Sequence, residues 1–266
     1  ATIIPDEIVG TNGRDTLIGT EGPDAIYGLK GADRLEGREG NDLLNGGGGK
    51  DRLFGEEGND RLFGGAKNDT LDGGTGRNVL NGGKGNDTAD YNVTTEVTVS
   101  LALSGFQQTG VSNDKLTGIE NVSGGTRSDT LTGNDQDNVL TGRKGGDMLE
   151  GAGGADTLRG GNGSDKLSGG EGDDALTGGK ARDMLTGGSG ADDFIFVSGV
   201  NESVDRITDF EDGLDSIVVI GGDFDSVEIN SANGGRNTRI DFDDGTKVLL
   251  QNVNASLIGE DDFSFI

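Results

Sequence analysis

The sequence contains no cysteine and no histidine, which excludes disulfide bonds, thiolate metal ligands, and imidazole ligands or general bases. Tryptophan is also absent, proline occurs twice, and aromatic residues make up 5% of the chain. Hydrophobic residues make up 30%, which is too few for an ordinary globular core in 266 residues. Oxygen is therefore the only ligand chemistry that remains, and a conventional globule is not expected.

Positive charge is scarce as well, because 22 Lys and Arg against 48 Asp and Glu give a formal net charge of −26. This self-repulsion opposes compaction unless cations bind, and it argues against nucleic acid or an anionic membrane surface as a partner. No apolar run approaches the ~18 residues of a membrane span. The N-terminal ATIIPDEIV lacks the basic start and apolar middle of a secretory signal peptide, so export would need another signal.

The chain is rich in glycine instead, with 53 residues arranged on a nine-residue period. The stretch GGGGKDRLFGEEGNDRLFGG at 46–65 nearly repeats itself after nine residues. Nine consecutive nonapeptides run from residue 10 to 90, and eight more run from 124 to 195. Their sixth residue is Asp, or Asn at 78 and 138, and their eighth residue is apolar. This in-phase repetition argues strongly against a glycine-rich linker.

Each nonapeptide divides into a turn and a short strand. Glycines at the first, second and fourth positions permit positive φ, so six residues can form a tight turn whose carbonyls point at a common centre. The last three residues read polar, apolar, polar, which is one pleat of a strand. Two nonapeptides therefore form an 18-residue coil, and two parallel sheets meet through a single ladder of Leu and Ile.

Stacked coils place the aspartates of one edge ~4.8 Å apart, where they repel unless a cation lies between them. Ca²⁺ suits these turns better than Mg²⁺, because it accepts six to eight oxygen ligands in irregular geometry. The candidate carboxylate ligands are Asp15, Asp24, Asp33, Asp42, Asp51, Asp60, Asp69 and Asp87 in the first array, and Asp129, Asp147, Asp156, Asp165, Asp174, Asp183 and Asp192 in the second.

The units resemble the RTX, or haemolysin-type calcium-binding, repeat G-G-x-G-x-D-x-(apolar)-x, as in GGKGNDTAD at 82–90 and GGNGSDKLS at 160–168. The resemblance covers both arrays and implies an all-β, right-handed parallel β-roll that binds several Ca²⁺ ions. Each ion would lie between two same-edge turns. One turn would supply its Asp and the carbonyls of its second and fourth residues, and the next turn its Asp and the carbonyls of its first and third.

The resemblance assigns ligands residue by residue. The turns at 46–51 and 64–69 would supply Gly47, Gly49 and Asp51 with Gly64, Ala66 and Asp69. The turns at 160–165 and 178–183 would supply Gly161, Gly163 and Asp165 with Gly178, Lys180 and Asp183. The turns at 169–174 and 187–192 would supply Gly170, Gly172 and Asp174 with Gly187, Ser189 and Asp192. Weaker or empty sites are expected at the departures from the motif, which are Asn78, Asn138, Lys67, Arg127, Gln136 and Ala181.

Five segments are expected: an N-terminal cap at 1–9, the first roll array at 10–90, a β-rich interruption at 91–123, the second array at 124–195 and a C-terminal antiparallel β cap at 196–266. In the interruption, the alternation from Val97 to Leu103 predicts a strand. Asp114 and Leu116 repeat the relation of the sixth and eighth positions, so a continued roll with wider turns is preferred to an independent domain. Asp114 is equally compatible with a solvated loop. In the tail, strands are expected at 205–210, 215–220, 238–242 and 246–250.

The phrases DRITDFEDGLDSI and LIGEDDFSFI resemble the C-terminal region of RTX exoproteins exported by type I ABC transporters. That resemblance implies an uncleaved C-terminal export signal and a secreted protein, extracellular or at the cell surface. Scarce Ca²⁺ inside the cell would leave the chain unfolded and threadable, and millimolar Ca²⁺ outside would fold it.

Catalysis is not expected, because periodic turns account for the acidic pairs and no nucleophile with a base stands out. Scattered G-x-G-x-x-G matches follow from the glycine content and do not predict a nucleotide site. The first hypothesis is a complete secreted calcium-binding protein with a surface, adhesion or matrix role, whose partner could be a cell-surface or matrix polysaccharide. The alternative is the C-terminal folding and secretion module of a larger protease, lipase or epimerase. Ala1, if left by removal of an initiator Met, would favour the first.

Overall fold

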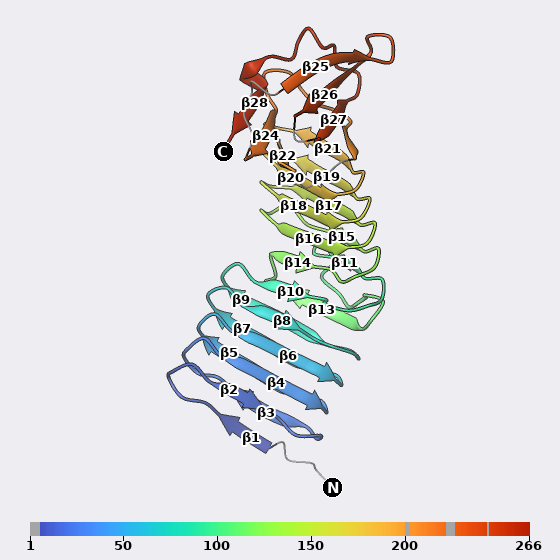
Figure 1. Ribbon diagram of the computed structural model, residues 1–266. Coiled ribbons are helices and arrows are strands. Elements are labelled where there is room, and N and C mark those ends of the chain that lie inside the picture. The colour runs from blue at the N-terminus through green and yellow to red at the C-terminus, as the bar shows by residue number, and fades with distance from the viewer. Residues whose placement is uncertain (1–5, 200–202, 222–226, 244) are drawn as a thin grey trace. The chain divides into compact units, whose positions relative to one another are not determined.

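The computed structural model describes residues 6–199, 203–221, 227–243 and 245–266, which form β-strands and the short 3-10 helix η2 (Glu260–Asp262). The chain divides into two compact units, Ala1–Gly124 and Gly125–Ile266 (Figure 1). No helix within the described ranges has the length and apolar character needed to cross a membrane. The predicted N-terminal cap lies partly outside these ranges, since the description begins at residue 6.

In the first unit, successive nonapeptides add strands alternately to two sheets. One sheet has the order β1 (Asp6–Val9), β3 (Asp24–Tyr27), β5 (Leu43–Gly48), β7 (Arg61–Ala66), β9 (Val79–Lys84), β13 (Asn113–Thr117) and β12 (Gln107–Gln108). The other has the order β2 (Thr16–Ile18), β4 (Arg34–Glu39), β6 (Arg52–Glu57), β8 (Thr70–Asp72), β10 (Thr88–Asp90) and β14 (Asn121–Ser123). All these neighbours are parallel except β12 and β13, which are antiparallel.

The second unit has the same construction. One row of strands is β15 (Thr130–Thr132), β17 (Met148–Gly153), β19 (Lys166–Glu171), β21 (Met184–Ser189), β23 (Val204–Ile207), β27 (Lys247–Leu250), β26 (Asn237–Phe242) and β25 (Val227–Ala232). The other is β16 (Val139–Lys144), β18 (Thr157–Asn162), β20 (Ala175–Lys180), β22 (Asp193–Val197), β24 (Ser216–Ile220) and β28 (Phe263–Phe265). The all-β parallel roll predicted from the repeat is confirmed.

The core of each unit is the predicted single-file ladder of eighth-position side chains. Ile26 pairs with Leu44, Leu44 with Leu62 and Leu62 with Leu80, each at 0% exposure. In the second unit, Leu158, Leu176 and Phe194 follow the same register. Each partner lies 18 residues along the chain, because two nonapeptides complete one coil. A thin ladder of this kind explains how a chain with 30% hydrophobic residues folds.

The interruption at 91–123 contributes strands to the roll, but its first strand is shorter than the alternation predicts. β11 covers only Thr98–Ser100, and Leu103 is 52% exposed, so the prediction of a strand as far as Leu103 is wrong. Leu116 pairs in parallel with Leu80, and Val122 pairs with Ala89. Asp114 is fully buried, which excludes the solvated-loop interpretation.

The tail contains less antiparallel structure than predicted. β23 and β24 pair in parallel with the preceding roll strands β21 and β22, and β28 pairs in parallel with β24. Among the described residues of the tail, only β25, β26 and β27 form an antiparallel arrangement, and β27 pairs in parallel with β23. The roll therefore continues beyond the nine-residue period before two antiparallel strands, β26 and β25, extend the edge of one of its sheets.

Candidate metal centre

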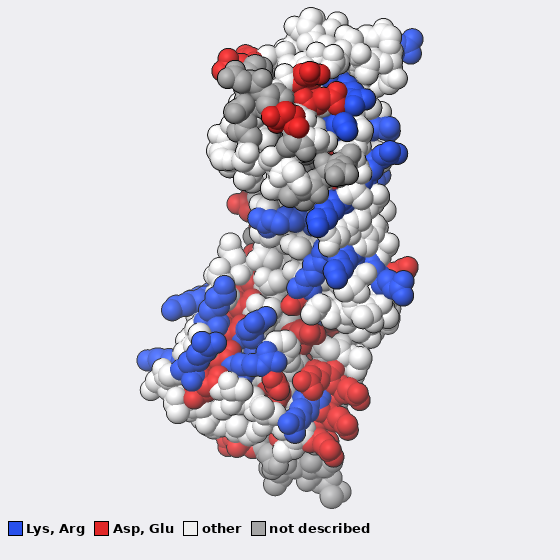
Figure 2. Space-filling view, in the orientation of Figure 1, with Lys and Arg blue, Asp and Glu red and all other residues white. Residues whose placement is uncertain are grey.

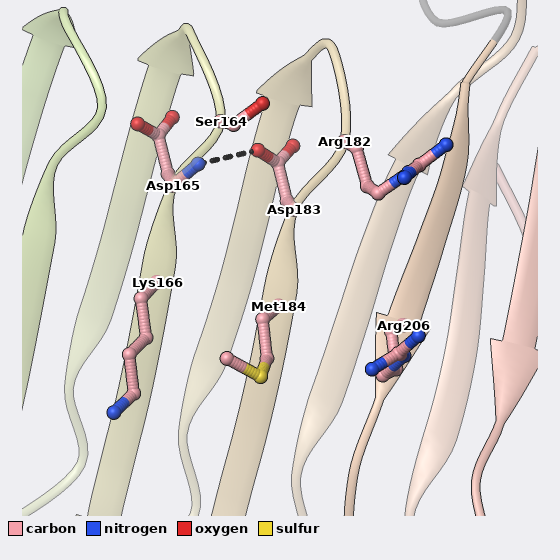
Figure 3. Close-up of a pocket in the computed structure, with 7 residues that line it drawn as sticks. All are labelled: Ser164, Asp165, Lys166, Arg182, Asp183, Met184 and Arg206. Carbon is pink, nitrogen blue, oxygen red and sulfur yellow. Dashed lines mark hydrogen bonds between the residues drawn. The ribbon is translucent and has the colours of Figure 1, made fainter.

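The sixth-position aspartates form rows in which each carboxylate binds the backbone of the preceding same-edge turn. The Asp33 N–H donates to Asp51 Oδ1 at 2.8 Å, and the Asp51 N–H donates to Asp69 Oδ1 at 2.8 Å. Figure 3 shows the same bond from the Asp165 N–H to Asp183 Oδ1, at 2.9 Å. These side chains are 0–3% exposed. The turns therefore hold carboxylates out of water in an order fixed by hydrogen bonds.

The second carboxylate oxygen in these rows is buried without a hydrogen-bond partner. A buried carboxylate oxygen left unpaired is strongly unfavourable, so a missing cationic ligand is the natural explanation. The unpaired oxygens are the Oδ2 atoms of Asp33, Asp42, Asp51, Asp60, Asp69, Asp87, Asp147, Asp156, Asp165, Asp174, Asp183 and Asp192.

Backbone carbonyls converge on these oxygens where glycine leaves room. A Cβ built at Gly46 would lie 2.5 Å from Asp51 Oδ2 and 2.8 Å from the carbonyl oxygen of Gly64, in the next same-edge turn. A Cβ built at Gly169 would likewise contact Asp174 Oδ2 and the carbonyl oxygen of Gly187. Any side chain at the first position would thus fill the space between two oxygen donors, which explains the glycine there.

Other carbonyls of the predicted ligand sets also face the gap between turns. Toward the turn at 187–192, the Gly170 and Gly172 carbonyls point at Gly188 and Gly190. From that turn, the Ser189 carbonyl points back and accepts a bond from the Gly172 N–H at 2.8 Å. In the pair at 46–51 and 64–69, the Gly47 carbonyl faces the later turn, the Gly64 carbonyl faces the earlier one, and the Ala66 carbonyl accepts a bond from the Gly49 N–H. In the pair at 160–165 and 178–183, the carbonyls of Gly161, Gly178 and Lys180 take the same three roles, the last accepting from the Gly163 N–H.

This donor set fits a hard cation. In the described part of the chain, no place brings three or more acidic side chains into a metal-binding arrangement, so carbonyls have to complete any site. Paired carboxylate oxygens with several carbonyls match the mixed, irregular oxygen shell of Ca²⁺. The residues present therefore fit calcium, and each mid-row Asp has one oxygen toward each of its two same-edge neighbours.

Burial in these rows raises the pKa of the aspartates, and neighbouring carboxylates raise it further. The pKa of Asp60 and of Asp69 rises to about 7, and that of Asp183 to about 8, with desolvation the largest cause and Asp42, Asp51 or Asp205 adding repulsion. Hydrogen bonds from the backbone oppose the shift. Metal-free turns consequently hold protons near neutral pH.

Acid should therefore partly substitute for calcium. Because the folded-state pKa lies above the unfolded value of 3.8, the folded form binds more protons, and its stability falls as pH rises from about 4 through about 7. In chelator, circular dichroism should show more β-structure at pH 4.5 than at pH 8. With Ca²⁺ present the order should reverse, since protons compete for the ligands. Equal spectra at both pH values in chelator would contradict the assignment.

Three predicted ligands differ from the rest of the rows. Asp15 and Asp24 Oδ2 accept bonds from the N–H and hydroxyl of Thr11 and Thr20, and Asp129 Oδ2 accepts a bond from the Gly125 N–H. These are the carboxylates of the first turns of each array. Their second oxygens already have partners within their own turn, so they are not orphaned.

Departures from the motif do not remove the turn. Lys67 and Ala181 replace the fourth-position glycine and adopt positive φ angles of 81° and 76°. Asn78 keeps the row bond, since its Oδ1 accepts from the Asp60 N–H at 3.0 Å. Its amide donates to Asp114, which also accepts bonds from the Tyr91 and Ser112 hydroxyls at 3.1 and 2.6 Å. Hydrogen-bond donors thus take the place of a cation beside Asp114.

Sequence reasoning missed three residues that extend the rows. Glu120 Oε2 accepts from the Asp87 N–H at 2.8 Å, Asp205 Oδ1 from the Asp183 N–H at 2.9 Å and Asp215 Oδ1 from the Asp192 N–H at 3.1 Å. Each precedes an apolar residue by two positions, as in ENV, DRI and DSI. That acid-x-apolar spacing is the signal that could have identified them.

The family model described as the RTX calcium-binding nonapeptide repeat (4 copies) matches the chain at residues 9–44, 27–62, 54–89, 116–149, 123–158, 150–185 and 159–194. These matches together cover more than half of the chain, and nonapeptide repeats of this kind bind calcium. Among curated proteins, no match was found.

Similar solved structures include the extracellular lipase LipA from Serratia marcescens, at 21% identity and a TM-score of 0.29. That match covers 95% of this chain and 40% of the lipase, so the chain spans less than half of the lipase's length. Two subunits of the mannuronan C5-epimerase from Azotobacter vinelandii, AlgE6R3 and AlgE6R2, match at 25% and 26% identity with TM-scores of 0.30 and 0.26. The AlgE6R3 match covers 52% of this chain and 78% of that subunit, and the AlgE6R2 match covers 53% of this chain and 91% of that subunit.

Proposed function

Because the chain belongs to the family of RTX calcium-binding nonapeptide repeat proteins, we propose that it is a secreted protein that folds on Ca²⁺ outside the cell and has a non-catalytic surface, adhesion or matrix role. The observation that carries this proposal is the row of buried Oδ2 atoms without hydrogen-bond partners. Glycine carbonyls converge on the same gaps, and together with these carboxylate oxygens they provide the mixed oxygen ligands that Ca²⁺ requires.

The proposed ligands are the carboxylates and carbonyls that face each gap, as in Asp174 and Asp192 with the carbonyls of Gly170, Gly172, Gly187 and Ser189. A bound Ca²⁺ would supply positive charge to these carboxylates. The chain's own residues do the rest: Asp Oδ1 positions each turn on its neighbour, and glycine keeps the gap open. Without the ion, burial and mutual repulsion of the aspartates oppose folding, as their raised pKa values indicate.

Export through a type I ABC transporter is part of the proposal, and a cell-surface or matrix polysaccharide is the proposed later partner. An intracellular chain that lacks Ca²⁺ has a core only one side chain thick to offset a backbone entropy cost of ~1–2 kcal/mol per residue. It should therefore remain unfolded until it meets millimolar Ca²⁺, when binding to several sites stabilises the folded state.

Deleting residues 252–266 should abolish secretion from a host that expresses a type I transporter, while Ca²⁺ binding by the two arrays stays almost intact. The deletion also removes β28, which pairs with β24. A Val218→Ala and Val219→Ala variant in β24 is the matched control, because it weakens the pairing of β24 with β28 and leaves residues 252–266 unchanged. Immunoblots of medium and cells measure the secreted fraction. Normal secretion of the truncated chain would show that the signal lies elsewhere.

The alternative is a C-terminal folding and secretion module of a larger exoenzyme, such as a protease, lipase or epimerase. The same roll and tail would serve that role. The reading frame upstream of residue 1 discriminates the two: an open frame that continues into this chain favours the module, and a start codon favours the complete protein.

A further inference from the structure

The two turn edges of the first unit carry opposite exposed charges. The turns at 10–15, 28–33, 46–51, 64–69 and 82–87 form a basic edge, whose second to fifth positions contain no acidic residue and five exposed cations: Arg14, Lys30, Lys50, Lys67 and Lys84. The turns at 19–24, 37–42 and 55–60 form an acidic edge, with exposed Glu21, Glu39, Glu56 and Glu57 against Arg38, and the turn at 73–78 that follows on this edge adds the exposed Arg77. In Figure 2, blue side chains protrude from the left flank of this part of the molecule, with red ones between them, and the group at its lower right is mainly red.

The second unit repeats the separation. Its turns at 124–129, 142–147 and 178–183 carry Arg127, Arg143, Lys144, Lys180 and Arg182, while its turns at 133–138 and 169–174 carry Asp135, Asp137, Glu171 and Asp173. Figure 3 shows Arg182 directed away from the carboxylates of Asp165 and Asp183. The cations of this edge are therefore presented outward and are not placed to neutralise the buried aspartate row.

Calcium binding does not require this separation. Both edges have the same turn geometry, the ligand carboxylates are buried, and the exposed charges occupy positions that offer only backbone carbonyls to the gap. An acidic polymer would account for the basic edge alone. A second copy of the chain accounts for both edges, because each copy carries the two complementary surfaces.

Consecutive turns on either edge are one coil apart, so the exposed charges of the two edges repeat at the same distance. Lys30, Lys50 and Lys67 lie on three consecutive turns of one edge. Glu21, Glu39 and Glu57 lie on three consecutive turns of the other, each at the third position. Two edges with equal spacing can place opposite charges beside each other on every coil.

We propose that the folded chain associates side by side with copies of itself, the basic edge of the first unit against the acidic edge of the same unit in the next copy. The contact uses two different surfaces, so it leaves one edge free at each end and can extend into rows. Exposed ion pairs are individually weak and screened by salt, so association depends on several adjacent pairs and on ionic strength. The inference rests on the proposed function only in that Ca²⁺ must first fold the roll.

Sedimentation velocity in millimolar Ca²⁺ tests this with two charge-reversed variants. One carries Lys30→Glu, Lys50→Glu and Lys67→Glu and so has two acidic edges. The other carries Glu21→Lys, Glu39→Lys and Glu57→Lys and so has two basic edges. Each alone should self-associate at least about tenfold more weakly than the wild type, because attraction becomes repulsion at three pairs. An equimolar mixture should associate again, and raising the salt should dissociate the wild type.

A variant with Arg52→Glu, Arg159→Glu and Lys166→Glu makes the same change in net charge as the triple Lys→Glu variant, but on exposed strand positions away from the edges. It should associate as the wild type does. A wild type that stays monomeric, association that salt does not weaken, or a mixture that fails to associate would each overturn the proposal. Monomer that binds a polyuronate column through the three lysines would assign the basic edge to an acidic polymer instead. Circular dichroism of the same samples measures calcium-dependent folding. A failure of the proposed calcium-dependent folding is therefore distinguishable from a failure of association.

Discussion

In chelator at neutral pH the chain is expected to give the far-UV circular dichroism of a coil, and millimolar Ca²⁺ is expected to convert it to β-structure. The physical reason is the rows of buried aspartates with unpaired Oδ2 atoms, whose repulsion the single-file ladder of Leu and Ile cannot offset. Mg²⁺ at the same concentration should leave the coil largely unchanged, because it demands near-octahedral geometry and gives up its water reluctantly.

The Ca²⁺ titration should be steep, because each coil forms on its neighbours and the proposed ligand sets would give two adjacent sites one carboxylate in common. Na⁺ at matched ionic strength is the control for simple screening of the −26 net charge. A native β spectrum in chelator at pH 8, or folding by Mg²⁺ at the same midpoint as Ca²⁺, would contradict the role given to the turns.

Replacing Asp51 by Asn should shift the Ca²⁺ midpoint of folding to clearly higher concentration and lower its apparent cooperativity. Asp51 lies between two same-edge turns: Oδ1 accepts from the Asp33 N–H, and Oδ2 faces the Gly64 carbonyl. One substitution therefore weakens two proposed sites, shared with the turns at 28–33 and 64–69. Removing one partner of a buried charge pair costs about 3–5 kcal/mol, here divided between the two sites.

The chain itself shows that Asn is tolerated in the turn, because Asn78 keeps the bond from the Asp60 N–H. Asp212→Asn is the matched control, since Asp212 is exposed in the tail outside the period. Its midpoint should equal that of the wild type within error, as measured by circular dichroism against free Ca²⁺. Equal shifts for both variants would mean that net charge, and not the geometry of the turn, controls folding.

The coil, its ladder and the buried rows were predictable because the nine-residue period is strict within both arrays. Where the spacing changes, the prediction fails: Asp205 and Asp215 follow their row neighbours by 22 and 23 residues instead of 18, so a fixed period misses them. The strand predicted as far as Leu103 is also too long. Alternation shows that one face could be buried, but it does not show that a partner covers it.

The state of each carboxylate was not predictable from the motif. Asp15 and Asp51 occupy the same position of the repeat, yet only Asp51 has an unpaired Oδ2. Asp15 begins its row, and Thr11 in its own turn donates to its Oδ2 through both the N–H and the hydroxyl. That difference depends on the exposure of the first turn and on one neighbouring side chain, which the nine-residue pattern does not specify.

The bonds between carboxylates and backbone along each row all run one way, from the N–H of one turn to the Oδ1 of the turn that follows it on that edge. Each turn is thus completed by its C-terminal neighbour. Among these carboxylate bonds, loss of a coil from the C-terminal side leaves a buried sixth-position N–H without its partner, whereas loss from the N-terminal side leaves a carboxylate oxygen without its donor. The backbone bonds between coils run in both directions, as from the Arg52 N–H to the Asp33 carbonyl and from the Gly28 N–H to the Asn45 carbonyl. The carboxylate rows therefore add a polarity that the backbone bonds lack: the sixth-position N–H of a turn is paired only once the coil after it has formed.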